Sequence, residues 1–169
     1  PESKPQISDA DSIRTAIGQG TNNFTATQLA RYVTTLANSG TCYDLSLVSE
    51  IKDIDGNVVY KNEHKVQNQL DFPVEQWNVV RQGMRQVVSV HTSSSALINQ
   101  INVAVAGKTG TAQQSEARPN HALFVSFAPY ENPEVTVTSV IPFGYSSGNA
   151  VELSGLVSVS YTHLRAHET

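Results

Sequence analysis

Residues 106–112 read AGKTGTA, and this stretch decides the fold. It follows the apolar residues 103–105 and precedes, after a polar gap, a second apolar run at 121–127, HALFVSF. Short runs of this kind bounded by turn formers are typical of strands. We therefore expect a strand over 103–112 that carries the tetrapeptide Lys-Thr-Gly-Thr.

The tetrapeptide is the candidate binding site of the chain. Alternate residues of a strand share a face, so we expect Lys108 and Gly110 on one side and Thr109 and Thr111 on the other. A glycine in a strand lets a ligand or a second backbone approach closely. An ammonium near two hydroxyl groups suits a carboxylate ligand.

A nucleotide-binding loop is the competing interpretation of the same residues. Gly107, Lys108 and Thr109 match the end of the pattern G-x-x-x-x-G-K-[ST], but the first glycine of that pattern would fall at Asn102. The lysine of such a loop opens a helix, and the strand pattern that follows here opposes one. We therefore disfavour this interpretation.

Two more strands are expected after the tetrapeptide. Residues 122–127 and 135–141 alternate or run apolar, and residues 129–133 between them are rich in turn formers. Together with 103–112 they predict three neighbouring antiparallel strands. Earlier in the chain, Asp55-Gly56 predicts a tight hairpin between residues 45–54 and 57–61.

Apolar residues at helical spacing predict two amphipathic helices. The first spans 24–40, where Thr25 and Gln28 form a capping box and Gly40 supplies the stop. The second spans 74 to about 90. A short helical stretch is expected around 96–101.

The C-terminal residues begin as a helix and then change character. Residues 150–153 start a helix that should pack on the sheet, whereas residues 158–169 lose the apolar period. We expect the helix to stop near Ser158. Residues 158–169 are similar to translated adapter read-through, so the domain is placed at 1–157 and 158–169 is interpreted as a non-native tail.

Composition limits the classes of function. The chain has 169 residues, 39% of them hydrophobic, and a net charge of -4, which argues against nucleic-acid binding. A single cysteine, Cys42, excludes an internal disulfide and is interpreted as a structural thiol. No apolar run approaches the roughly 20 residues that span a bilayer. The histidines are dispersed, so we expect no metal and no cofactor.

Several segments, in order, resemble the C-terminal half of the transpeptidase domain of class B penicillin-binding proteins. The resemblance covers about residues 10–153. It rests on AIGQG (16–20), TQLARY (27–32), ANSG (37–40), DGN (55–57), GMRQVV (83–88), AGKTGTA (106–112), residues 121–129 and NPE (132–134). So many matches in one order make it specific.

The resemblance implies an α+β fold, an antiparallel sheet covered by helices, here incomplete. It implies a serine D,D-transpeptidase that acts on the D-Ala-D-Ala end of peptidoglycan stem peptides and is trapped by β-lactams. Lys108 would place positive charge near the substrate and help proton transfer. Thr109 and Thr111, with Gly110 between them, would bind the substrate carboxylate. The N–H of Thr111 would be one oxyanion-hole donor.

The family order is S-x-x-K, then S-x-N, then K-T-G, and the first two motifs precede the segment that begins here at Ala16. We therefore expect the first half of the domain, with its nucleophile, to lie outside this chain, and the chain alone to be inactive. Ser49 and Lys52 fit S-x-x-K but lie in a predicted hairpin. Residues 147–149 fit S-x-N but follow K-T-G, and helix capping is the preferred interpretation.

Other functions remain open in the sequence. A fragment of a serine β-lactamase or β-lactam sensor shares K-T-G, and a non-catalytic remnant or a binding module is a further alternative. The resemblance implies a place on the extracytoplasmic face of the bacterial membrane, with an anchoring helix outside this chain and contacts with cell-wall synthesis proteins. We also expect Leu123, Phe124, Val125 and Phe127 or their neighbours to form an exposed apolar patch that lowers solubility.

Overall fold

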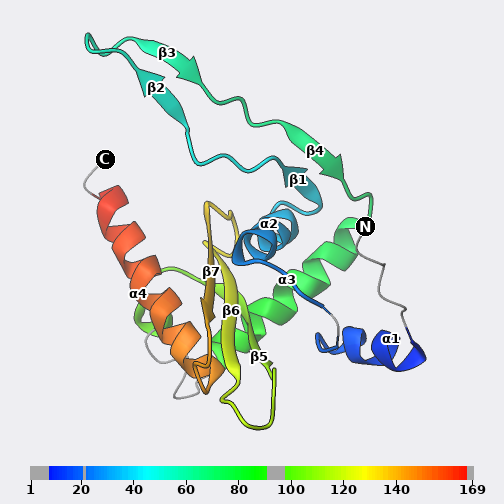
Figure 1. The fold of residues 1–169 in the computed structure, drawn as a ribbon. Coiled ribbons are helices and arrows are strands. Elements are labelled where there is room, and N and C mark those ends of the chain that lie inside the picture. The colour runs from blue at the N-terminus through cyan, green and yellow to red at the C-terminus, as the bar shows by residue number, and fades with distance from the viewer. Residues whose placement is uncertain (1–7, 21, 91–97, 167–169) are drawn as a thin grey trace.

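The computed structural model describes residues 8–20, 22–90 and 98–166 (Figure 1). In these residues the order of elements is α1 (Asp9–Ala16), α2 (Ala26–Ala37), β1 (Thr41–Tyr43), β2 (Glu50–Lys52), β3 (Val58–Lys61), β4 (Val66–Gln69), α3 (Val74–Ser89), a 3-10 turn η2 (Ile98–Gln100), β5 (Ala106–Ala112), β6 (His121–Ala128), β7 (Val135–Ile141) and α4 (Ser147–Ala166).

The centre of the fold is an antiparallel sheet with the order β5-β6-β7. The register pairs Ala106 with Phe127 at one end of β5 and Ala112 with His121 at the other. The three predicted antiparallel strands are thus confirmed. Residues 103–105 precede β5 as a loop, so the strand starts three residues later than expected.

Helices cover both faces of the sheet, with α4 on one side and α2 and α3 on the other (Figure 1). The two sides enclose separate cores, one around Phe124 and Val151 and one around Phe127, Val33 and Trp77. This arrangement confirms the predicted α+β class. It is also the reason why β6 has buried side chains on both faces.

The predicted capping box of the first helix is present. The Thr25 hydroxyl accepts a hydrogen bond from the Gln28 N–H, and the Gln28 side chain accepts one from the Thr25 N–H at 2.8 Å. The helix ends at Ala37, and Ser39 and Gly40 both take positive φ angles, which confirms the stop at that point. In the second helix, α3, the buried residues are Trp77, Met84 and Val88.

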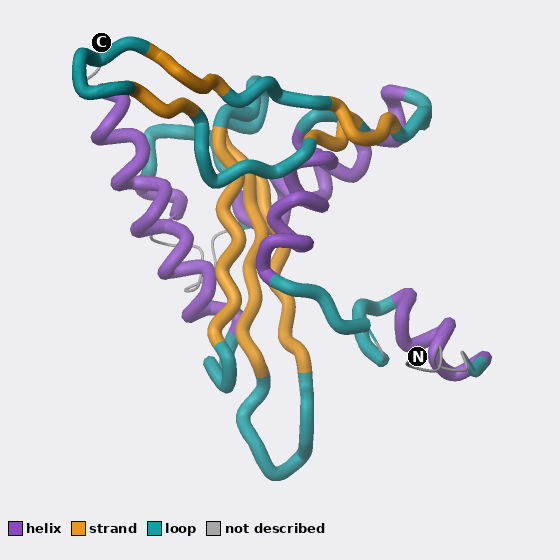
Figure 2. The backbone as a smooth tube through the Cα atoms, turned by 45° about the horizontal axis from the view of Figure 1, so that its top comes forward, coloured by secondary structure: helices purple, strands orange, loops and turns teal. Residues whose placement is uncertain are grey.

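A two-stranded ribbon, residues 41–69, projects from the end of α2 (Figures 1 and 2). Its outer part is the predicted hairpin, in which β2 pairs with β3 across the Asp55-Gly56 turn. Its inner part, the pairing of β1 with β4, was not expected from the sequence. Every residue of β2, β3 and β4 is exposed, so these strands show no buried face.

The expected end of the last helix near Ser158 is wrong, because α4 continues to Ala166 and crosses the proposed boundary at 157. Ser154 and Ser158 are both buried. The Ser154 hydroxyl lies 2.7 Å from that of Ser139, and the Ser158 hydroxyl donates to the Ser154 carbonyl at 2.8 Å. The buried face of α4 therefore carries serines with hydrogen-bonded hydroxyls in place of apolar side chains. For this reason the sequence loses its apolar helical period there although the helix continues.

The expected apolar patch is also wrong for its two aromatic residues. Phe124 and Phe127 are each 1% exposed, one covered from the α4 side and the other from the α2 and α3 side. Leu123 and Val125 are half-buried. Among the described residues, the most exposed large apolar side chains include Leu47 on the ribbon.

The remaining helical prediction, 96–101, is met in part by the turn η2, and residues 96 and 97 lie outside the described residues. Across the described ranges, no helix combines the length and the apolar character needed to span a membrane.

Candidate active site

The Lys-Thr-Gly-Thr tetrapeptide, residues 108–111, lies within β5, the edge strand of the described sheet. Lys108 and Thr111 are exposed, and Thr109 and Gly110 are half-buried. The predicted strand is therefore observed.

The two faces of β5 are divided as the spacing predicted. Lys108 stands opposite Val125, whereas Thr109 stands opposite Phe124, whose ring packs in the core beneath α4. The Lys108 ammonium nevertheless reaches the strand edge, where it donates to the Thr109 carbonyl at 2.8 Å. The Lys108 ammonium and the two threonines therefore lie together at the edge of the strand, and not on one face of it.

At Thr109 and Thr111 the backbone C=O groups point to the free edge of β5, away from β6. The Thr109 carbonyl accepts from Lys108, and the Thr111 carbonyl accepts from Gln19 Nε2 at 3.0 Å. In an antiparallel pair, residues whose N–H and C=O both face the partner alternate with residues whose groups both face away. Thr109 and Thr111 belong to the second set, so their N–H groups also face the edge.

Such an edge can bind an extended ligand by adding it as a strand. A ligand carbonyl placed against the Thr111 N–H would receive a backbone donor, and a ligand carboxylate would find the Lys108 ammonium and the threonine hydroxyls nearby. An acyl compound placed there would be oriented and polarised by these groups.

The two matches to upstream motifs lie elsewhere in the fold. Ser49 precedes β2 in the ribbon, and the Lys52 ammonium forms an ion pair with Glu50 at 2.8 Å. Residues 147–149 form the start of α4, as expected, but the capping oxygen belongs to Ser146, which accepts from the Gly148 N–H. Neither segment is part of β5.

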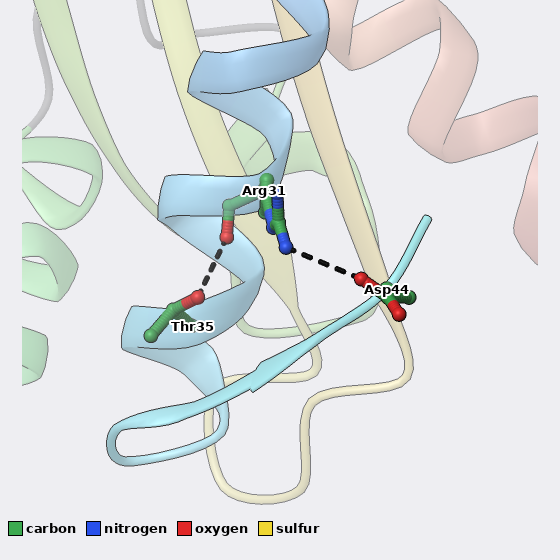
Figure 3. A network of polar contacts seen from close by, with 3 residues as sticks. All are labelled: Arg31, Thr35 and Asp44. Atoms are coloured by element: carbon green, nitrogen blue, oxygen red, sulfur yellow. Dashed lines mark hydrogen bonds and ion pairs between the residues drawn. The ribbon is translucent and has the colours of Figure 1, made fainter. Parts of the chain in front are cut away.

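A second polar cluster joins α2 to the base of the ribbon (Figure 3). The Arg31 guanidinium lies 3.4 Å from the Asp44 carboxylate, and the Thr35 hydroxyl donates to the Arg31 carbonyl at 2.8 Å. Hydrogen bonding from Thr35, and less strongly from Arg31, lowers the pKa of the Cys42 thiol. This cluster ties two elements together and has no contact with the tetrapeptide among the interactions described.

Among the described residues, no three histidine, cysteine or carboxylate side chains gather closely enough to hold a metal ion.

Sequence reasoning missed Gln19, which lies in the turn after α1 and contacts the end of the tetrapeptide. The segment AIGQG was noted only as part of a resemblance. Its two glycines, Gly18 and Gly20, both adopt positive φ and were the available signal that the turn has a defined shape.

Comparison with known proteins settles the family. The profile of the penicillin binding protein transpeptidase domain matches residues 1–153. The chain belongs to this family. As a transpeptidase-family chain it is 31% identical over 173 residues to the peptidoglycan D,D-transpeptidase MrdA of Haemophilus influenzae, covering 92% of this chain and 26% of that protein.

Solved structures agree with this assignment. Penicillin-binding protein 2B of Streptococcus pneumoniae superposes with a TM-score of 0.82 at 25% identity, covering 94% of this chain and 28% of that one. The imipenem acyl-enzyme complex of penicillin-binding protein A from M. tuberculosis shares the fold, with a TM-score of 0.70 at 24% identity over 85% of this chain and 33% of that one. The chain spans about a quarter of the length of the curated relatives it matches.

Proposed function

We propose that this chain forms the substrate-binding wall of a peptidoglycan D,D-transpeptidase that is inhibited by β-lactams. The observation that carries the proposal is the Lys-Thr-Gly-Thr tetrapeptide on an edge strand whose backbone donors face outward, in a chain of this family. The activity of MrdA and the imipenem complex of penicillin-binding protein A support the same reaction and inhibitor class.

In this proposal a serine hydroxyl attacks the carbonyl of the penultimate D-Ala of a stem peptide. The bond from serine oxygen to carbonyl carbon forms, the C–N bond to the last D-Ala breaks, and the serine proton passes to the leaving amine. The Thr111 N–H donates to the oxyanion that develops on the carbonyl. Lys108, Thr109 and Thr111 bind the carboxylate of the leaving residue, and Lys108 assists the proton transfer.

The serine is proposed to come from a part of the protein that precedes this chain. Ser49 is the residue of this chain that fits S-x-x-K, and it lies on the exposed ribbon rather than on a helix facing β5. A serine and a lysine need to share a helical face to act as nucleophile and base. We therefore expect this chain alone to form no acyl-enzyme.

The proposed cellular location follows from the proposed substrate. Stem peptides lie outside the cytoplasmic membrane, so the proposed location is the extracytoplasmic face of that membrane, with an anchor in the preceding part of the protein. Other cell-wall synthesis proteins are proposed as partners.

The test is covalent labelling of the complete parent protein with a fluorescent penicillin. We expect labelling of the parent, none of residues 1–169 alone, and at least about a hundredfold slower labelling of Lys108→Ala, the range found when a key electrostatic group is removed. Lys52→Ala is the matched control, because this lysine belongs to the S-x-x-K match on the ribbon, which is not part of β5. Loss of labelling in Lys52→Ala with normal labelling in Lys108→Ala would refute the proposal.

A further inference from the structure

Gln19 is fixed by the backbone around it. The N–H of Gly18 donates to the Thr15 carbonyl at 2.9 Å and the N–H of Gln19 to the Arg14 carbonyl at 2.8 Å, while Gly18 takes φ +76°. These features are a Schellman motif, which ends a helix in a defined geometry. The Gln19 carbonyl in turn accepts from the Asn22 amide at 3.3 Å.

These hydrogen bonds hold the backbone of Gln19 in one conformation, so its side chain starts from a fixed position. Its amide donates to the Thr111 carbonyl, which lies 92 residues further along the chain. Helix α1 buries no residue, so packing of that helix does not explain the contact. The turn holds a single amide at the edge of β5.

The position of that contact along the strand is informative. The C=O and N–H of Thr111 face the same edge, and the C=O is occupied by Gln19 while the N–H is left for a ligand. An extended ligand can therefore pair with the edge as far as Thr111 and is stopped there by the Gln19 amide.

We infer that Gln19 is a positioning residue, which anchors the Thr111 carbonyl and so fixes the direction of the Thr111 N–H toward a substrate carbonyl. This inference rests on the proposed function. Gln19 itself touches no reacting atom. Its effect falls on the acylation step, because a misdirected N–H stabilises the developing oxyanion less well while ground-state binding of the ligand is little changed.

The experiment measures acylation of the complete parent protein by benzylpenicillin, separating the acylation rate k2 from the dissociation constant Kd. In Gln19→Glu the side chain keeps its size but its carboxylate cannot donate. We expect k2 to fall about tenfold, less than the roughly 10²–10³-fold loss on removing an oxyanion donor itself, and Kd to stay nearly unchanged in Gln19→Met, which cannot donate either and adds no charge near the ligand carboxylate. Gln82→Glu makes the same change at an exposed site on α3 and leaves k2 unaltered.

A pH series separates positioning from mere support of the fold. A protonated glutamate donates as glutamine does, whereas the ionised form, which prevails above the ordinary glutamate pKa of about 4.3, does not. The ratio of k2 in Gln19→Glu to k2 in the parent should therefore rise as pH falls from 8 to 5. Gln19→Met cannot donate at any pH, so its ratio should stay low and flat.

The outcomes are distinguishable. If the parent itself is not acylated, the proposed function fails. If the parent is acylated and Gln19→Glu matches it at pH 8, or if both variants are slow with ratios independent of pH and lowered melting temperatures, the positioning role is refuted.

Discussion

At the scale of single residues, Gly107 sets how closely β5 lies on the core. A Cβ atom built at this position would clash with Cζ of Phe124 and would lie 2.9 Å from the Val125 carbonyl oxygen. The ring is held in the core beneath α4, and the carbonyl belongs to the backbone of the neighbouring strand. Neither group has room to move away.

We therefore expect Gly107→Ala to lower the free energy of unfolding by about 2 kcal/mol or more, as overpacking of a core does. Thermal melts of the two proteins measure the change. Gly83→Ala is the matched control, since the new Cβ would meet nothing within 4 Å on helix α3. There the same substitution should raise stability by about 0.5–1 kcal/mol. Equal effects at both positions would contradict the steric argument.

The sequence predicts the strand that carries the candidate site, but it does not predict which residue from another segment contacts that strand. The opposite faces of Lys108 and Thr109 follow from the alternation of a strand, which is local. The contact of Gln19 with Thr111 spans 92 residues, and no local pattern specifies such a pairing. Sequence reasoning recognised the segment that holds Gln19 without finding its role.

At the scale of elements, the ribbon hairpin depends on one carboxylate. Hydrogen bonds from the side chain and N–H of Asn57, followed by that from the Asp55 N–H, lower the pKa of Asp53. The charged carboxylate is the form that accepts these bonds, so the unfolded hairpin binds a proton more readily than the folded one.

The order of the hairpin should consequently be constant above the unfolded pKa of about 3.9 and be lost as pH falls through the lower folded pKa of Asp53. The amide proton shift of Asn57, followed against pH by NMR, measures this. Asp53→Ala should remove the transition and disorder the turn at neutral pH, whereas Asp55→Ala, whose carboxylate accepts none of these bonds, should keep it. A turn that stays ordered in Asp53→Ala would contradict the assignment.

Helix α4 shows where pattern reading fails at this scale. The two amphipathic helices α2 and α3 were predicted because their buried faces are apolar. The buried face of α4 includes Ser154 and Ser158, whose hydroxyls are satisfied by a strand and by the helix itself. Because these buried residues are polar, the sequence shows no apolar helical period in this part of α4.

Truncation after residue 157 tests whether the end of α4 belongs to the fold. Removal of 158–169 takes away the buried Ser158 and the last turns of the helix, so we expect a melting temperature several degrees lower. A control truncation that removes 167–169 alone retains Ser158 and should melt as the full chain does. An unchanged melting temperature after the longer truncation would support the interpretation of 158–169 as a non-native tail.

At the scale of the whole molecule, the two-sided packing of the sheet moves the exposed apolar surface away from its centre. Phe124 and Phe127 are covered, whereas Leu47 and Ile54 on the ribbon are 105% and 100% exposed. The ribbon also presents strand edges, which are templates for pairing with another chain. Self-association, expected from the sequence at the sheet, is therefore expected at the ribbon.

The double variant Leu47→Lys/Ile54→Lys tests this expectation. Both side chains are fully exposed, so the melting temperature should stay unchanged while self-association, measured by sedimentation velocity over a concentration series, decreases. The two lysines bring the net charge of -4 closer to zero, which by itself favours association. Gln76→Lys/Gln82→Lys makes the same charge change at exposed polar positions of α3. If this control reduces association as much as the ribbon variant, charge rather than the apolar ribbon governs it, and the location on the ribbon is wrong.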